Sequence, residues 1–168
     1  MVYLIGYMGS GKTTFGRLLA KKLKISFLDT DLEIEKKEKK SISAIFKENG
    51  ESYFRKLENQ LLKTLNNKKL ISCGGGIPIH NNNMSLINKK GKSIYLKGSS
   101  NYLAERLKNN QKRRPLICDI EKRNLEKHIK KELEKREPLY NLAHYTILLD
   151  HKDKETILRE IHSLILSF

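Results

Sequence analysis

The sequence has only two cysteines, Cys73 and Cys118, among its 168 residues, and it has no tryptophan. Two cysteines form neither a disulfide framework nor a cysteine metal cluster. No apolar run approaches the roughly 20 residues that a membrane-spanning helix needs. A strand-like pattern begins at residue 2, which leaves no room for a signal peptide. We therefore expect a cytoplasmic protein without a membrane partner.

Aromatic residues are also scarce, at 7% of the sequence, whereas charged residues are abundant and mostly positive. The formal net charge of +15 is typical of proteins that bind nucleic acids. However, the lysines are scattered along the whole chain, and no alternation of basic and aromatic residues indicates a base-stacking surface. We therefore expect no nucleic-acid partner. A basic nucleic-acid-binding module is kept as the alternative from another functional class.

The length predicts one domain, residues 1–168, with a substantial core. Strand-like and helix-like patterns alternate with short connections, which indicates a parallel sheet covered by helices. Strands are expected at residues 2–5, 25–28, 70–72, 93–96 and 145–149. Helices are expected at residues 13–23, 32–40, 41–49, 51–66, 100–109, 120–136 and 154–168. The sequence therefore predicts an α/β fold.

The most informative stretch runs from Gly6 to Thr13, with the sequence GYMGSGKT. It matches the phosphate loop, in which two glycines bracket four residues before a lysine and a hydroxyl residue. Glycines let backbone N–H groups converge on an anion, and the helix that follows adds its positive end. Lys12 can reach the outer phosphates, and the Thr13 hydroxyl can hold Mg²⁺. The stretch predicts a nucleoside-triphosphate site.

Two acidic residues follow the second expected strand, at the sheet edge where parallel α/β proteins bind ligands. Asp29 and Asp31 are two residues apart, so along an extended strand end both side chains can point to the same side. One carboxylate can hold Mg²⁺, and the other can take the proton of an acceptor hydroxyl. The alternative is a turn whose aspartates cap the next helix.

Three arginines are candidates for contacts with anions. Arg55 precedes Glu58 by three residues on an expected helix face, either as a surface ion pair or as a guanidinium held by Glu58 for an anionic substrate. Arg114 lies in a polar segment, at about residues 110–123, that we expect to be mobile. Arg136 is expected at the end of its helix, where it could also compensate helix-end charge.

Six motifs, taken in order, resemble the shikimate kinase family, and the resemblance covers essentially the whole chain. The motifs are residues 6–13, Asp29-Thr30-Asp31, Phe54-Arg55 with Glu58, Gly74-Gly75-Gly76, Arg113-Arg114-Pro115-Leu116 and Arg136-Glu137-Pro138-Leu139-Tyr140. The resemblance implies transfer of the ATP γ-phosphate to the 3-hydroxyl of shikimate, on the route to chorismate and the aromatic amino acids. It also implies a three-layer P-loop kinase with a five-stranded parallel sheet, helices on both faces and a mobile lid.

The resemblance assigns Asp31 to the shikimate hydroxyls and makes it the expected base. Arg55 and Arg136 would clamp the shikimate carboxylate. The other substrate-binding residues that it implies are Phe46, Phe54, Gly75 and Gly76. Helices at about residues 32–66 would contribute much of this substrate site.

For the nucleotide, the resemblance implies ATP as co-substrate, with Mg²⁺ held by Thr13 and, through a water, by Asp29. Lys12 would neutralise developing charge, and Arg114 would reach the phosphates from a lid at about residues 110–123. Both are therefore expected to be catalytic together with Asp31. The expected nucleotide-binding residues are Gly9, Ser10, Gly11, Lys12, Thr13, Thr14, Arg106 and Arg114.

The chain departs from the family pattern at two places. Leu116-Ile117 stands where the family usually has two leucines, and the loop at residues 150–154 lacks the proline that many relatives place near adenine. A gluconate- or nucleotide-type kinase on the same scaffold is the neighbouring alternative. Because no coiled-coil pattern or exposed apolar stripe is present, we expect a monomer.

Overall fold

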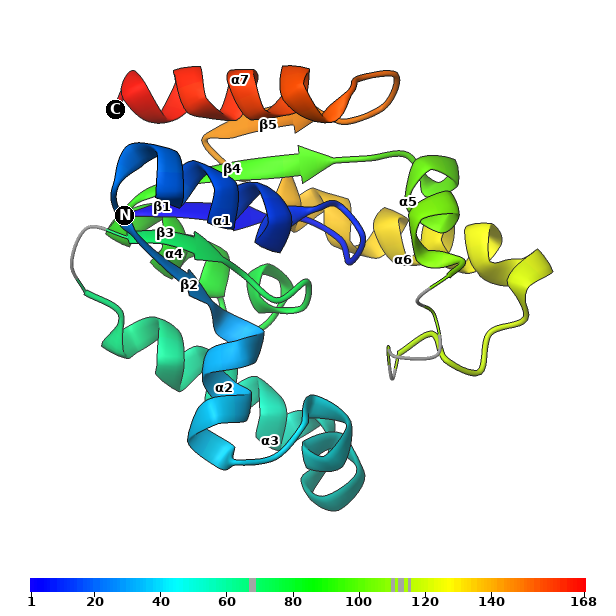
Figure 1. The fold of residues 1–168 in the computed structure, drawn as a ribbon. Coiled ribbons are helices and arrows are strands. Elements are labelled where there is room, and N and C mark those ends of the chain that lie inside the picture. The colour runs from blue at the N-terminus through cyan, green and yellow to red at the C-terminus, as the bar shows by residue number, and fades with distance from the viewer. Residues whose placement is uncertain (67–68, 110, 112–113, 115) are drawn as a thin grey trace.

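A five-stranded parallel sheet forms the centre of the computed structural model, which describes residues 1–66, 69–109, 111, 114 and 116–168 (Figure 1). The strand order is β2-β3-β1-β4-β5. The strands are β1 (Val2–Ile5), β2 (Ser26–Asp29), β3 (Lys69–Ser72), β4 (Lys92–Lys97) and β5 (Tyr145–Leu148). The helices are α1 (Lys12–Leu23), α2 (Thr30–Glu38), α3 (Ile42–Thr64), α4 (Asn83–Lys90), α5 (Ser100–Leu107), α6 (Leu125–Tyr140) and α7 (Lys154–Leu166), with 3-10 turns η1 (Ile77–Ile79) and η3 (Lys122–Asn124).

The sheet is covered on both faces, which confirms the predicted three-layer α/β fold. Helices α1 and α7 lie on one face, and α3, α4 and α6 lie on the other (Figure 1). Along β1 the side chains alternate: Val2 and Leu4 join the core under α1 and α7, whereas Tyr3 and Ile5 join the opposite core. A strand buried on both faces reads as a continuous apolar run, as this one does.

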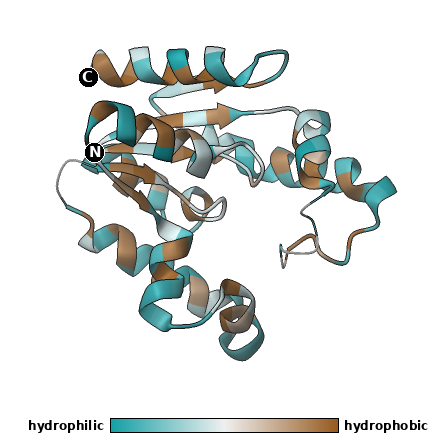
Figure 2. Ribbon diagram, viewed as in Figure 1, coloured by the Kyte–Doolittle hydropathy of each residue, from teal (hydrophilic) through white to brown (hydrophobic). Residues whose placement is uncertain are grey.

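Hydrophobic residues are concentrated in the strands and on the helix sides that cover them (Figure 2). The C-terminal helix α7 packs its apolar side on the sheet, with Ile157 and Ile161 fully buried. Within the described part of the chain, no helix has both the length and the apolar character that crossing a membrane requires.

The strand register aligns the carboxyl ends of β1, β2 and β3. Asp29 of β2 pairs with Ser72 of β3, and Ser72 pairs with Leu4 of β1. The phosphate loop, the two aspartates and the glycine triplet all follow these strand ends. Parallel pairing therefore brings the three motifs to one edge of the sheet, as expected for an open α/β fold.

Gly50 divides α3 into two helical segments, as the sequence predicts. Its φ of 78° and ψ of 171° are not helical, and its positive φ favours glycine. The Ser41 side chain accepts a hydrogen bond from the Ala44 backbone N–H at 3.2 Å, so the first segment has a serine cap. The break turns the second segment, which carries Phe54 and Arg55, against the sheet.

Two sequence expectations about helices were wrong. Helix α4 was not predicted, because the run of asparagines at its start is typical of a loop. Met84 and Ile87 are buried in the core, and Leu86 packs against it. Helix α6 was predicted at residues 120–136, but it begins at Leu125 and continues through Pro138 to Tyr140. Proline removes only one helical hydrogen bond near the exposed end of the helix, where water can satisfy the carbonyl. Arg136 is therefore an interior helical residue.

Lys90 caps the end of α3 from α4. Its ammonium donates hydrogen bonds to the backbone carbonyls of Leu62, Lys63 and Leu65 at 2.8, 2.7 and 3.0 Å. These carbonyls carry the partial negative charge of a helix end.

We predict that Lys90→Met lowers the free energy of unfolding by about 1–2 kcal/mol, measured by urea denaturation. The exposed neighbour Lys89 is the control, and Lys89→Met should change the free energy of unfolding by less than about 0.5 kcal/mol. An equal loss of stability in the two variants would contradict the cap.

Candidate active site

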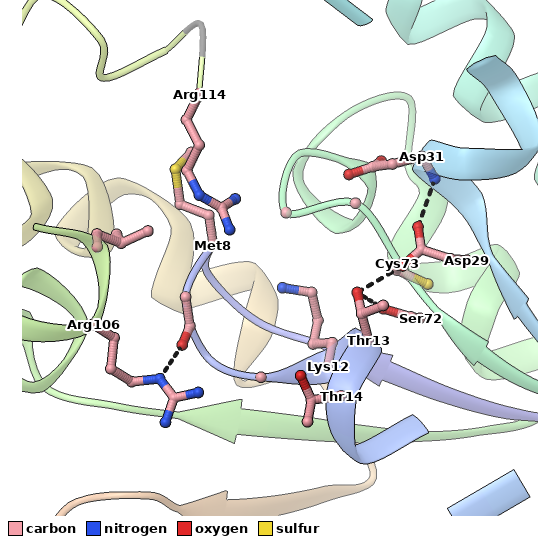
Figure 3. Close-up of a pocket in the computed structure, with 15 residues that line it drawn as sticks. Met8, Lys12, Thr13, Thr14, Asp29, Asp31, Ser72, Cys73, Arg106 and Arg114 are labelled. Atoms are coloured by element: carbon pink, nitrogen blue, oxygen red, sulfur yellow. Dashed lines mark hydrogen bonds between the residues drawn. The ribbon is translucent and has the colours of Figure 1, made fainter. Parts of the chain in front are cut away.

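The loop between β1 and α1 forms a cradle for an anion at the carboxyl edge of the sheet (Figure 3). Gly11 has a φ of 92°, and a Cβ there would lie 2.7 Å from the Phe15 ring, so conformation and space both require glycine. Helix α1 begins immediately after it. A cleft of about 300 Å³ lies over the loop and is lined by Gly9, Gly11, Thr13 and Thr14. A helix N-terminus with converging amides suits a phosphate group.

Lys12 lines this cleft with its ammonium buried. The ammonium donates to the carbonyl oxygens of Gly6 and Tyr7 at 2.8 and 2.9 Å, and lies 3.4 Å from Ser10 Oγ. Burial lowers the pKa of Lys12 to about 8, against the opposing effect of Asp31. Ser10 is fully buried beside Lys12 and does not line the cleft, so its expected nucleotide contact stays a prediction.

Asp29 caps α2 with one carboxylate oxygen and contacts Thr13 with the other. Its Oδ1 accepts hydrogen bonds from the backbone N–H groups of Asp31 and Leu32 at 3.0 and 3.4 Å and so caps α2. Its Oδ2 accepts from Thr13 Oγ1 at 2.6 Å, and Ser72 Oγ lies 3.4 Å from the same hydroxyl. A carboxylate and hydroxyls are hard oxygen donors, the kind that Mg²⁺ prefers. These residues therefore fit a magnesium ion.

Asp31 reaches the cleft from the first turn of α2. The expectation that Asp29 and Asp31 share an extended strand end was wrong, because α2 begins at Thr30. Both carboxylates nevertheless line the same cleft, and Figure 3 shows Asp31 directed toward its centre, as is the Lys12 ammonium. Burial raises the pKa of Asp31 to about 6, and the nearby Asp29 charge acts in the same direction. A Cβ on Gly74 would overlap the Asp31 carboxylate.

A second cleft adjoins the first and shares Asp31, Met8 and Arg114 with it. Its walls include most of the residues expected to bind an acceptor, namely Phe46, Phe54, Arg55, Gly75, Gly76 and Arg136. The rings of Phe46 and Phe54 lie 4.9 Å apart between centroids. Asp31 therefore stands where the phosphate cleft meets a cleft that is lined by an aromatic wall and by Arg55, Arg114 and Arg136.

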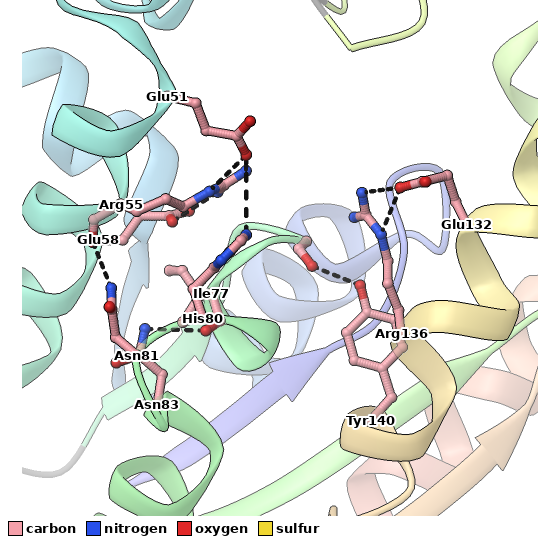
Figure 4. Close-up of polar contacts among 11 residues, drawn as sticks. Glu51, Arg55, Glu58, Ile77, His80, Asn81, Asn83, Glu132, Arg136 and Tyr140 are labelled. Carbon is pink, nitrogen blue, oxygen red and sulfur yellow. Dashed lines mark hydrogen bonds and ion pairs between the residues drawn. The ribbon is translucent and has the colours of Figure 1, made fainter.

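Arg55 is held on one side of the second cleft by two glutamates (Figure 4). Nη1 donates to Glu58 Oε2 at 2.7 Å, and Nε and Nη2 donate to Glu51 Oε1 at 3.1 and 2.7 Å. Glu58 is 1% exposed, so the pair is buried, in contrast to the surface ion pair considered for it. Burial raises the pKa of Glu58 to about 7, although Arg55 opposes the shift. A Cβ on Gly76 would overlap the Arg55 guanidinium.

Arg136 enters the same cleft from α6, opposite Arg55 (Figure 4). Its Nε and Nη2 donate to Glu132 Oε2 at 3.1 and 2.6 Å, and its Cζ lies 5.0 Å from the centroid of the Tyr7 ring. The Tyr140 hydroxyl, one turn further along α6, donates to the Gly75 carbonyl at 2.6 Å. Helix α6 is thereby joined to both the phosphate loop and the glycine triplet.

Two further arginines, Arg114 and Arg106, line the phosphate cleft. Arg114 lines both clefts, and burial lowers its pKa although Asp31 opposes the shift. Arg106 lines the phosphate cleft, where Nε donates to the Gly9 carbonyl at 2.8 Å and Nη1 donates to the Tyr102 hydroxyl at 3.1 Å. Arg113 and Pro115, which belong to the expected lid motif, lie outside the described residues. The lid therefore stays a prediction.

The sequence analysis missed several residues at the site. Met8 lines both clefts, and Ser72 lines the phosphate cleft, where its strand register places it. Thr30 Oγ1 accepts a hydrogen bond from the Gly74 N–H at 2.8 Å and so joins the motifs after β2 and β3. Glu51 and Glu132 had a recognisable signal, since each stands four residues before an arginine on a helix.

The comparisons with known proteins agree with this geometry. The family model described as shikimate kinase matches residues 8–166. The chain belongs to the shikimate kinase family. A shikimate kinase from Flavobacterium psychrophilum is 40% identical over 168 residues, which cover 98% of this chain and 98% of that protein. The family resemblance inferred from the motifs is thereby confirmed.

Solved structures of shikimate kinases have the same fold as this chain. That of the enzyme from Bacteroides thetaiotaomicron matches with a TM-score of 0.90 and 35% identity, over 98% of this chain and 97% of that chain. The enzyme from Acinetobacter baumannii, solved in complex with shikimate, matches with a TM-score of 0.89 and 37% identity, over 99% of this chain and 92% of that chain.

The raised pKa of Asp31 predicts a gain in stability when its charge is removed. A carboxyl whose folded-state pKa is raised loses stability as pH rises from its unfolded pKa, near 3.8, through about 6. We predict that Asp31→Asn raises the free energy of unfolding by about 1–3 kcal/mol at pH 7.5. The gain should fall below about 1 kcal/mol near pH 4, where Asp31 is protonated in the folded state and partly protonated in the unfolded state. Urea denaturation at the two pH values checks this, and a variant less stable than the parent at pH 7.5 would contradict it.

Proposed function

We propose that this chain transfers the γ-phosphate of ATP to the 3-hydroxyl of shikimate, giving shikimate 3-phosphate and ADP in the synthesis of chorismate and aromatic amino acids. The observation that carries the proposal is the junction of the two clefts at Asp31. One cleft suits a triphosphate, and the other offers two guanidinium groups to an anionic acceptor. Membership of the shikimate kinase family supports the same conclusion.

On the nucleotide side, the amides of the phosphate loop, from Gly9 to Thr14, bind the triphosphate. Lys12 neutralises charge that develops on the transferring phosphoryl group, and Arg114 contacts the phosphates from a lid at about residues 110–123. Arg106 covers the adenine. Thr13 and, through a water, Asp29 hold Mg²⁺, an assignment that their hydrogen-bonded oxygens support. The ion, when bound, neutralises phosphate charge.

On the acceptor side, Asp31 accepts the hydrogen bond of the 3-hydroxyl and takes its proton as transfer occurs. The acceptor oxygen forms a bond to the γ-phosphorus while the bond to the ADP oxygen breaks. Arg55 and Arg136 bind the shikimate carboxylate, since a guanidinium matches a carboxylate with two parallel hydrogen bonds. The backbone at Gly75 and Gly76 and the rings of Phe46 and Phe54 enclose the shikimate ring.

Residues 1–168 act as one kinase domain, with the acceptor site built largely from helices at about residues 32–66. The protein works as a cytoplasmic monomer on small molecules, without a nucleic-acid or membrane partner. The net charge of +15 draws anionic substrates toward the clefts.

A coupled assay for ADP release tests the substrate. We predict that shikimate exceeds gluconate and nucleoside monophosphates in kcat/KM by at least about 100-fold, because a shaped site leaves buried polar groups unpaired with the wrong acceptor. Comparable values for gluconate or a nucleotide would favour the neighbouring kinase class. Absence of turnover with every acceptor, together with steeply salt-dependent binding of DNA or RNA, would favour the nucleic-acid-binding alternative.

Asp31→Asn tests the proposed base. We predict a fall in kcat of about 100- to 10,000-fold with an unchanged affinity for ATP, because the phosphate loop is untouched. In the parent enzyme the base acts when deprotonated, so kcat/KM should fall as pH drops through about 6. Glu33→Gln, on the same helix and outside both clefts, is the matched control and should keep full activity. Turnover retained by Asp31→Asn would remove the residue from this role.

A further inference from the structure

Arg55 and Arg136, which line the second cleft, are each hydrogen-bonded to a glutamate in the same way. Arg55 donates Nε and Nη2 to one oxygen of Glu51, and Arg136 donates Nε and Nη2 to one oxygen of Glu132 (Figure 4). In both pairs the glutamate stands four residues earlier on the same helix. Residues at that spacing lie one above the other on a helix, and an arginine side chain extends toward its N-terminal turn.

The two glutamates do not line the cleft, whereas the arginines do. Both arginine side chains are 9% exposed and line the cleft, whereas Glu51 and Glu132 are 53% and 22% exposed and do not line it. An aromatic ring lies against each guanidinium as well, at 5.5 Å for Arg55 over Phe54 and 5.0 Å for Arg136 over Tyr7. A guanidinium has five N–H groups, and the glutamate takes two of them on one edge.

We propose that Glu132 is a positioning residue for acceptor binding: it fixes the Nε and Nη2 edge of Arg136, so that the other N–H groups meet the acceptor carboxylate. Glu51 has the same role for Arg55. The inference rests on the proposed function, because it requires a carboxylate in this cleft. An arginine side chain is flexible, and fixing it during folding removes an ordering cost from binding.

The charge of Glu132 and its position have opposite effects on an anionic acceptor. Burial would raise the pKa of Glu132, but hydrogen bonds from Arg136 and Lys135 outweigh it and hold the pKa below its ordinary value. Glu132 is therefore ionised at neutral pH. Its negative charge repels the carboxylate of the acceptor, whereas its hydrogen bonds orient Arg136 to bind that carboxylate. Because both hydrogen bonds end on a single oxygen, a glutamine oxygen can keep the position without the charge. Alanine removes both.

The test measures kcat and KM for shikimate in the parent enzyme and in three variants of α6. We expect Glu132→Ala to raise the shikimate KM about tenfold or more, with kcat within about threefold and the KM for ATP unchanged. Glu132→Gln should keep a shikimate KM within about threefold of the parent value, or below it, because the hydrogen bonds remain. Glu134→Ala, an exposed glutamate on the same helix, is the matched control and should leave both constants unchanged.

A second substrate separates positioning from a general structural effect. With a shikimate analogue that carries a hydroxymethyl group in place of the carboxylate, Glu132→Ala should change KM by less than about twofold. An unchanged shikimate KM in Glu132→Ala, or an equal loss in Glu132→Gln, would overturn the inference. If Glu132→Ala does not fold, the shikimate KM values of Glu51→Ala and Glu51→Gln, on α3, test the inference with the same expected results. A parent enzyme that does not phosphorylate shikimate would instead overturn the proposed function.

Discussion

The parallel register of β2, β3 and β1 is the constraint on which the site depends. Asp29, Ser72 and Leu4 lie at one level across the three strands, so the segments that follow them meet at one edge. Hydrophobic side chains on both faces of the sheet hold this register, because a slip of one residue would turn each of them to the opposite face. The chemistry at the edge therefore depends on the two cores beneath it.

Three ionisable groups at this edge have pKa values that are shifted toward neutral pH. Burial lowers the pKa of Lys12 to about 8 and raises the pKa values of Asp31 and Glu58 to about 6 and 7. Groups shifted in this way are typical of active sites, where proton transfer and charge neutralisation are needed. The same burial opposes folding, so each group requires a partner. Arg55 supplies it for Glu58, and the loop carbonyls supply it for Lys12.

The glycine triplet leaves space for side chains from α2 and α3, because its residues have no Cβ atom. Gly74 leaves room for the Asp31 carboxylate, and Gly76 leaves room for the Arg55 guanidinium. From the sequence, Gly75 and Gly76 were expected only as residues that bind the substrate. Their spatial role could not be predicted, because the side chains concerned come from α2 and α3, about 20 to 45 residues away in the chain.

The sequence by itself determined the features that depend on neighbours in the chain: the phosphate loop, the alternation of strands and helices, and the break at Gly50. It also sufficed for the family, because six motifs in order specify one pattern. Only the tertiary structure decided that Asp31 approaches from a helix, that α6 continues past Pro138, and that Arg55 and Arg136 face one cleft. These features result from contacts between segments far apart in the chain, and such contacts override local preference because they bury more surface and satisfy more polar groups.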